Sequence, residues 1–391
     1  MPRRLRRIAL ACLLLALTPT ANACTFCSGG VTSRQTLREH LATAQYAAYG
    51  KLKNPRVEPN GVSGVTDFEV VQVLKPHAPF AKTPAFVIPK YLPVVGNTPP
   101  EYLFFVSERD GKPDPFYGVP ATLPMCEYVA ALGKLKPADA TARLAFAFGH
   151  LDSGDPSVAA DAFLEFAKAT DAEIANAKAV LVPARLRKLL THSDTPADRL
   201  GVYAMLLGLC GGPDDRDTFD KLVTVQPLSP RVQDNLGGYL AGLTTLDAKL
   251  GWRRISAVID DAKRPYAERL SAIGTLRYFQ ASQGSTVRAD VVACYKALLK
   301  HPDLADLAIE DLRRWGYAEL TPDILALFAQ PTHASRLIRR AVVQYALTVP
   351  GADTAAFVAD VRAKDAKLVA TVEELMKLQE PKPPQAVSPK R

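Results

Sequence analysis

Hydrophobic and polar positions follow two different patterns along this chain, and the change falls near residue 126. Before it, short apolar runs with a period of two or with no polar interruption predict five β-strands, at residues 45–53, 67–74, 85–88, 102–106 and 116–119. A helix from Thr32 or Ser33 to about residue 44 is expected ahead of them. From Pro137 onward, apolar residues recur with helical spacing almost to the end of the chain.

The helical part has internal regularity. Asp155-Pro156 supplies an N-cap and a first-turn proline for a helix whose apolar residues share one face between 159 and 166. Residues 198–210 repeat the pattern and stop at Gly211. Such helix pairs recur roughly every 35 to 45 residues, and each can bury its apolar face only against a neighbour. The spacing predicts a helical-repeat solenoid, with an irregular all-helical domain as the alternative.

These patterns predict a multi-domain α+β protein. Five short strands with one helix fit a small β-barrel or sandwich of about 100 residues, followed by an all-α repeat domain. We expect a leader at residues 1–23, a β-rich domain at 24–135, the helical domain at 136–379 and a disordered, proline-rich tail at 380–391.

The leader has the three parts of an export signal. A basic cluster within residues 3–7 precedes an apolar run at 8–17, and small residues occupy the −3 and −1 positions before a cleavage site between Ala23 and Cys24. The mature chain is therefore expected to be exported, to the periplasm or the outside of the cell. A lipid anchor on Cys24 is the alternative processing, although Ala21 stands where lipoprotein processing favours a large aliphatic residue.

Five cysteines remain after the leader is removed, an odd number for an exported protein. The disulfide candidates are Cys24, Cys27 and Cys126. A bond from Cys126 to one of the first pair would close a loop of about 100 residues and stabilise the fold by roughly 3 to 5 kcal/mol. The alternatives are a redox-active Cys24–Cys27 bond and a metal site completed by His40.

Charge changes the picture little. Loss of the four leader arginines lowers the formal charge from +8 to +4, and the tail holds a further net +2. Basic residues such as Arg336, Arg339 and Arg340 are interspersed along the chain with acidic ones such as Asp353 and Asp360, which favours solvated helix faces over nucleic-acid binding. No apolar run after the leader reaches the roughly 20 residues of a transmembrane helix.

The sequence contains no assembled catalytic motif: no His-Glu-x-x-His, no Gly-x-Ser-x-Gly and no phosphate-binding glycine loop. We therefore expect no catalytic, cofactor-binding or metal-binding residues. The expected function is a non-catalytic protein-binding or scaffolding protein of the cell envelope, and a thiol–disulfide oxidoreductase is the alternative.

Three resemblances add to these expectations. Residues 155–169 resemble the second helix of a HEAT repeat, and residues 137–379 resemble degenerate HEAT-like units, a family that usually binds proteins on its concave face. Residues 24–135 are similar to the netrin-type domain of tissue inhibitors of metalloproteases, through strands like 68–75 and 102–106 and a cysteine opening a later helix. That likeness implies an OB-like barrel and a third hypothesis, protease inhibition through the α-amine of Cys24. Two residues separate the first cysteines here, however, where that family has one.

The layout as a whole resembles an uncharacterised family of exported bacterial proteins. The likeness rests on the Cys-x-Phe-Cys start at residues 24–27 and on the Gly-Leu-Cys-Gly stretch at residues 208–211. It implies no activity.

Overall fold

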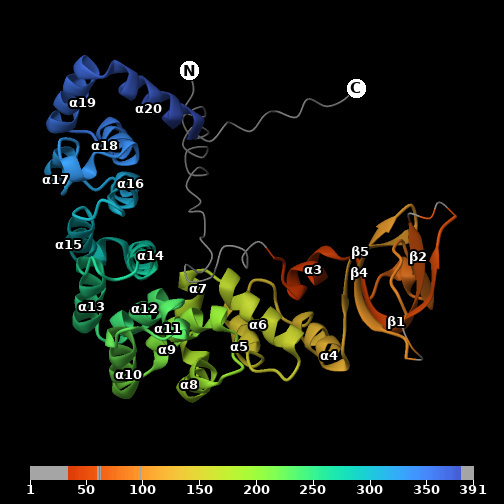
Figure 1. Ribbon diagram of the computed structural model, residues 1–391. Helices are drawn as coiled ribbons and strands as arrows, with labels where there is room; N and C mark the ends of the chain where they lie inside the picture. Colours follow the sequence, from red (N-terminus) through yellow and green to blue (C-terminus); the bar gives the residue numbers. More distant parts are fainter. Residues whose placement is uncertain (1–33, 60, 62, 95, 97, 380–391) are drawn as a thin grey trace, which may run out of the picture. The chain divides into compact units, whose positions relative to one another are not determined.

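The computed structural model describes residues 34–59, 61, 63–94, 96 and 98–379. The predicted leader, Cys24, Cys27 and the predicted tail lie outside these residues. The chain divides into two compact units between Gly212 and Pro213, each described here by itself (Figure 1). The sheet and the first helices share one unit. The domain boundary expected at residue 135 lies inside this unit and stays a prediction.

The first unit begins with a helix and a five-stranded antiparallel sheet in the order β3-β2-β1-β4-β5. The strands match the five predicted ones, and a 3-10 turn, η1 (Ala78–Phe80), lies between the second and third. The mixed α+β class, with strands first and helices after, is confirmed. The elements are α3 (Leu37–Thr43), β1 (Tyr46–Val57), β2 (Gly64–Lys75), β3 (Ala85–Ile88), β4 (Glu101–Arg109) and β5 (Lys112–Pro120).

Both faces of the sheet are apolar. One face packs on α3 and α4 (Leu123–Leu132) through side chains that include Tyr49 and Phe105. The other gathers an aromatic cluster around Phe68 and Phe104, whose ring centroids lie 4.9 Å apart. The alternating strand pattern therefore serves two hydrophobic cores.

The strand ladders of the described residues leave β3 and β5 as the two edges of the sheet. These edges approach each other. A closed barrel would also need a hydrogen-bonded ladder between them. Prolines at positions 113, 115 and 120 remove N–H donors from β5, which protects this edge from pairing with another strand.

Helices complete the first unit. Asp155 caps α6 as predicted, because its carboxylate accepts the N–H groups of Ser157 (2.8 Å) and Val158 (3.2 Å). Helix α9 is buried almost all round, which explains its uninterrupted apolar sequence. The helices are α5 (Ala140–Phe148), α6 (Pro156–Lys168), α7 (Asp171–Asn176), α8 (Pro183–Thr191) and α9 (Leu200–Cys210), with 3-10 turns η2 (Lys178–Val180) and η3 (Ala197–Arg199).

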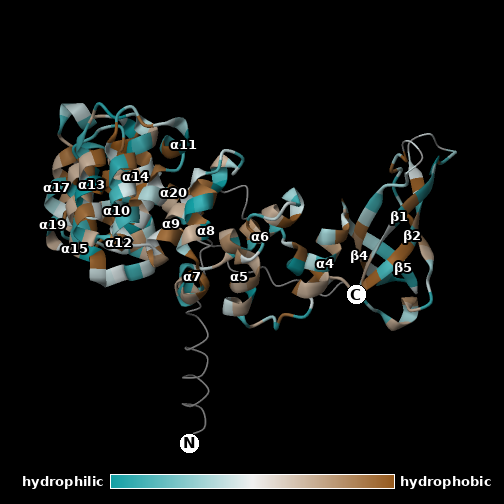
Figure 2. Cartoon of the chain, turned by 90° about the horizontal axis from the view of Figure 1, so that it is seen from below, coloured by the Kyte–Doolittle hydropathy of each residue, from teal (hydrophilic) through white to brown (hydrophobic). Residues whose placement is uncertain are grey.

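The second unit is helical and repeat-like. Helices that are next but one in sequence pack together: α12 on α14, α16 on α18 and α18 on α20. A second row, α13 on α15 and α17 on α19, lies beside the first, on the left in Figure 1. Hydrophilic and hydrophobic residues are mixed on the helices of this unit (Figure 2), although α12 is buried over most of its length. The helices are α10 (Pro213–Thr224), α11 (Pro230–Gln233), α12 (Leu236–Leu246), α13 (Ala248–Asp260), α14 (Tyr266–Gln283), α15 (Arg288–Leu298), α16 (Ala305–Trp315), α17 (Thr321–Leu327), α18 (Arg336–Thr348), α19 (Ala352–Lys364) and α20 (Ala366–Gln379), with 3-10 turns η4 (Gly284–Val287) and η5 (Pro331–His333).

Polar contacts join successive helix pairs at a nearly constant sequence separation. Three arginine–aspartate pairs each connect residues 34 apart, at 2.6, 2.5 and 2.8 Å; the pairs are Arg254–Asp220, Arg269–Asp303 and Arg277–Asp311. Arg288 meets Glu319 across 31 residues. We name this set the inter-pair ladder. Its separations of 31 and 34 residues are slightly shorter than the period expected from the sequence.

Among the described residues, the structure contains no helix that is both long enough and apolar enough to span a membrane.

Candidate functional site

The residues singled out in the sequence lead to the junction of α3, α4 and α6. Cys126 lies in the first turn of α4, fully buried, and forms no disulfide with a described residue. Burial raises the pKa of its thiol to about 12, so this cysteine is a poor nucleophile. Cys24 and Cys27 lie outside the described residues, and disulfide formation by these three cysteines stays a prediction.

Both ends of α3 are fixed by side chains. At its start Thr36 and Glu39 form a capping box: the Glu39 N–H donates to the Thr36 hydroxyl (3.2 Å), and the Thr36 N–H donates to the Glu39 carboxylate (2.9 Å). At its end the ammonium of Lys75 donates to the carbonyls of Leu41 (2.8 Å) and Ala44 (2.5 Å). A helix of seven residues is too short to be stable alone, so these contacts define it.

Two buried carboxylates on α6 hold α3 in place. Asp161 accepts the Leu37 N–H at 2.7 Å and the Tyr128 hydroxyl at 3.0 Å, and burial raises its pKa to about 7. One turn later Glu165, 1% exposed, accepts from Arg38 Nε at 3.0 Å and pairs with Arg143 Nε at 3.4 Å. These bonds link α3, α4, α5 and α6, so the carboxylates serve to position the helices.

His40 faces the sheet from α3. Its ring stacks on that of Tyr117 in β5, with centroids 3.7 Å apart and planes 8° apart. Burial lowers the pKa of this histidine, so the ring is neutral at pH 7. Its Nδ1 is buried without a hydrogen-bond partner among the described residues.

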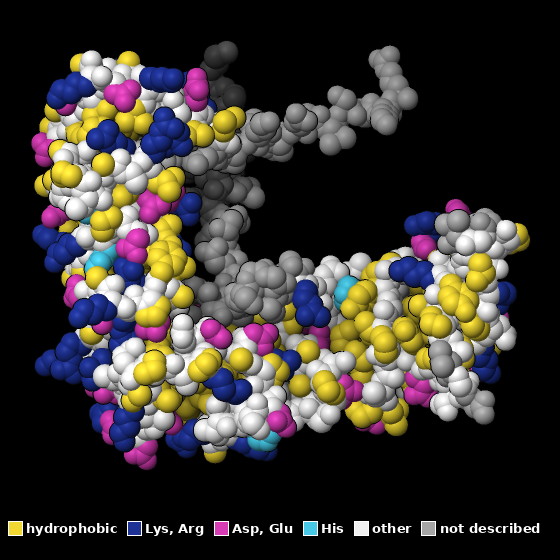
Figure 3. Space-filling model, viewed as in Figure 1, with side chains coloured by type: hydrophobic (Ala, Val, Ile, Leu, Met, Phe, Trp, Pro, Cys, Tyr) yellow, Lys and Arg dark blue, Asp and Glu magenta, His cyan; other side chains and the backbone are white. Residues whose placement is uncertain are grey.

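A cleft of about 720 Å³ opens beside His40. Tyr117, Met125 and Asp161 contribute to its walls, and Arg34 and Arg199 add charged groups. Apolar side chains gather in this part of the first unit, between α3 and the sheet (Figure 3). The cleft combines an apolar wall with a few polar groups, a composition typical of ligand sites.

The predicted metal alternative combines His40 and Cys126 with Cys24 and Cys27, which lie outside the described residues, so it stays a prediction. The rings next to His40 are aromatic, and no group of three His, Cys, Asp or Glu side chains that could hold a metal occurs within the described ranges. A metal site at His40 would therefore depend on Cys24 and Cys27.

No family model, no curated protein and no solved structure matches the chain.

Sequence reasoning identified His40 and Cys126 in this region but missed Asp161 and Glu165. Both belong to the helix that was predicted from Asp155-Pro156, and a signal was present. Two acidic residues four apart, Asp161 and Glu165, adjoin the apolar face of that helix. What the pattern could not supply is their partners, Leu37 and Arg38, which lie more than 120 residues earlier.

Proposed function

We propose that this chain is an exported, non-catalytic protein-binding or scaffolding protein of the cell envelope, with an OB-like head and a HEAT-like solenoid. The observation that carries the proposal is the inter-pair ladder. Contacts repeated every 31 to 38 residues, such as the Thr275 hydroxyl on the Gly237 carbonyl, favour a regular stack of helix pairs. A regular stack presents a continuous helical surface, which suits recognition of an extended protein partner.

The chemistry of the α3–α4–α6 junction supports binding over thiol catalysis. Both oxygens of Asp161 are engaged by groups that hold the fold together, and the Cys126 thiol is buried with a raised pKa. In this proposal the junction ties the sheet to the helices that follow it. The predicted staple from Cys126 to the mature N-terminus would add to the same connection.

Site-specific photocrosslinking in intact cells tests the proposal. A photoreactive amino acid is placed at Tyr266 or Leu337 on the helical body, which are 48% and 63% exposed, and at Val57 on the sheet, 60% exposed, as a matched control. We expect a discrete protein adduct from a helical position and none from Val57. Absence of adducts at all three positions, or the same adducts at all three, would contradict a specific binding surface on the helices.

A further inference from the structure

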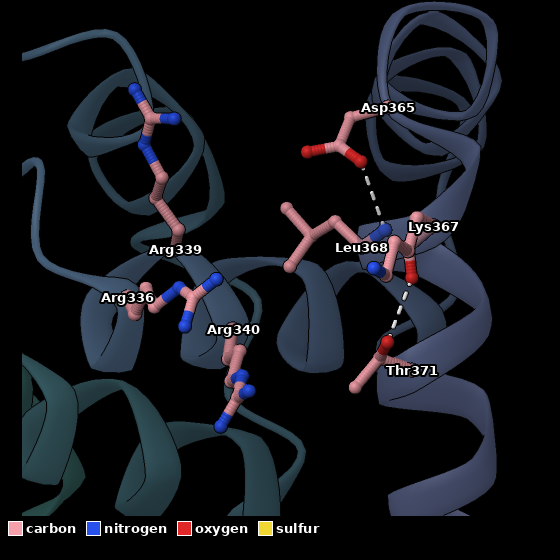
Figure 4. Close-up of a pocket in the computed structure, with 7 residues that line it drawn as sticks. All are labelled: Arg336, Arg339, Arg340, Asp365, Lys367, Leu368 and Thr371. Atoms are coloured by element: carbon pink, nitrogen blue, oxygen red, sulfur yellow. Dashed lines mark hydrogen bonds between the residues drawn. The ribbon is translucent and has the colours of Figure 1, made fainter.

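A cleft between α18 and α20 in the second unit is lined by four cations. Arg336, Arg339 and Arg340 come from the first turn and a half of α18, and Lys367 comes from the first turn of α20. The cleft has a volume of about 270 Å³ and is drawn in Figure 4. In that view the arginines are spread along the α18 wall, and Leu368 reaches into the gap from the opposite side.

These cations have no acidic partner among the described residues, unlike four arginines of the same unit. Arg254, Arg269, Arg277 and Arg288 each meet a carboxylate within 2.8 Å. In contrast, none of the four cations of the cleft forms an ion pair with a described residue. Arg339 lies over the ring of Phe328 at 5.2 Å, a contact that leaves its N–H donors available.

One carboxylate, Asp365, also lines the cleft, but it has another task. Its Oδ1 accepts the Leu368 N–H at 3.0 Å, which caps the start of α20 (Figure 4). The cleft therefore keeps a strong excess of positive charge. Arg336 and Arg340, one turn apart, also repel each other, and an anion between them would relieve that repulsion.

The helix backbones add to this field. The cations of both walls lie near the N-terminal ends of helices of 13 and 14 residues. Such ends carry partial positive charge and favour anions. The two helix ends and the four side chains all make the electrostatic potential in the cleft more positive. The cleft is therefore suited to a ligand with dense negative charge.

We propose that this cleft binds a phosphate-bearing ligand, a phosphomonoester or a diphosphate. The small volume admits one compact group, so the negative charge must be dense, and a single carboxylate supplies too little of it. Arginine also donates paired hydrogen bonds that match the oxygens of a phosphate. This site is independent of the protein-binding function proposed above.

Calorimetric titration of the mature chain with inorganic pyrophosphate tests the proposal. The double variant R336Q/R340Q removes two cations of the cleft. The control R314Q/K296Q removes two exposed cations of the same unit that are paired with Glu310 and Asp323. We expect R336Q/R340Q to bind at least about tenfold more weakly than the wild type and the control to stay within about twofold. If the double variant does not fold, Lys367→Gln serves instead, because Lys367 is exposed. We expect it to lose less pyrophosphate affinity than the double variant would.

Vesicles of phosphatidylcholine with phosphatidic acid, whose headgroup is a phosphomonoester, distinguish the source of the phosphate. Binding to these vesicles that R336Q/R340Q abolishes assigns the site to a lipid headgroup. Binding of pyrophosphate alone assigns it to a soluble ligand, and either result supports the proposal. Equal affinity of R336Q/R340Q and wild type, tighter binding of citrate than of pyrophosphate, or no binding to either probe at about 10 mM phosphate would overturn it.

Discussion

The ionisation of Asp161 determines how strongly α3 and α4 are held to α6. The carboxyl is 7% exposed and contacts two other elements, through the Leu37 N–H and the Tyr128 hydroxyl. Burial raises its pKa from 3.8 to about 7. The folded protein therefore keeps this proton at pH values where the unfolded chain has already released it.

The sign of the pH effect follows from this difference. Below about pH 4 Asp161 is protonated in both states, and its bonds stabilise the fold fully. As the pH rises from about 4 to 7, only the unfolded chain ionises, so the free energy of unfolding falls, and above pH 7 it levels off. A displacement from 3.8 to about 7 corresponds to roughly 4 kcal/mol over the whole range.

Two substitutions separate the charge of Asp161 from its hydrogen bonds. Asp161→Asn keeps an acceptor for Leu37 and gains a donor for Tyr128, as the protonated acid has, but it does not titrate. We expect its stability advantage over the wild type to grow by roughly 3 kcal/mol between pH 5 and pH 8. Asp161→Ala leaves two buried polar groups unpaired and should cost about 2 to 5 kcal/mol at pH 5.

Hydrogen exchange measured by mass spectrometry is the suitable assay. Both tryptophans of the chain, Trp252 and Trp315, lie in the second unit, so their fluorescence does not follow the first. Peptides covering α3 and α6 report the local opening free energy directly. Since wild type and D161N share every other titratable group, their difference isolates Asp161. Two results would refute the reasoning. One is a difference in opening free energy between wild type and D161N that stays the same from pH 5 to pH 8; the other is a loss of opening free energy in D161N as large as that in D161A.

The remaining predictions concern other parts of the chain. Gly251→Ala should destabilise the second unit by about 1 to 3 kcal/mol, because its Cβ would lie 2.2 Å from the Thr244 hydroxyl; urea unfolding followed by tryptophan fluorescence checks this, and an unchanged midpoint contradicts it. Peptide mapping of the unreduced mature protein should yield a crosslinked peptide that joins Cys126 to Cys24 or Cys27; a Cys126 that alkylates fully in denaturant without reductant argues against the staple. Small-angle scattering of the second unit alone, residues 213–379, should give an elongated profile, and a globular one would count against the solenoid.

Local sequence determined the elements and their order. The short apolar runs, alternating or uninterrupted, located all five strands, and the short strand at residues 85–88 has the predicted bounds. The Asp155-Pro156 pair placed the start of α6, because an N-cap and a first-turn proline act within one turn of backbone. The repeat spacing of the helical part was also present in the sequence, since it reflects apolar faces that each helix pair must bury.

The tertiary structure decided which polar groups meet. Asp161 and Glu165 adjoin an apolar helix face in the sequence, and only packing against a helix from the other end of the unit brings Leu37 and Arg38 to them. Arg336, Arg339 and Arg340 fit a solvated face by their spacing alone. They line a cationic cleft because α20 packs beside α18. The only carboxylate that lines the described cleft is Asp365, and it already caps α20. Periodicity fixes the face of a helix on which a side chain lies, whereas the group opposite it depends on a chain segment distant in sequence.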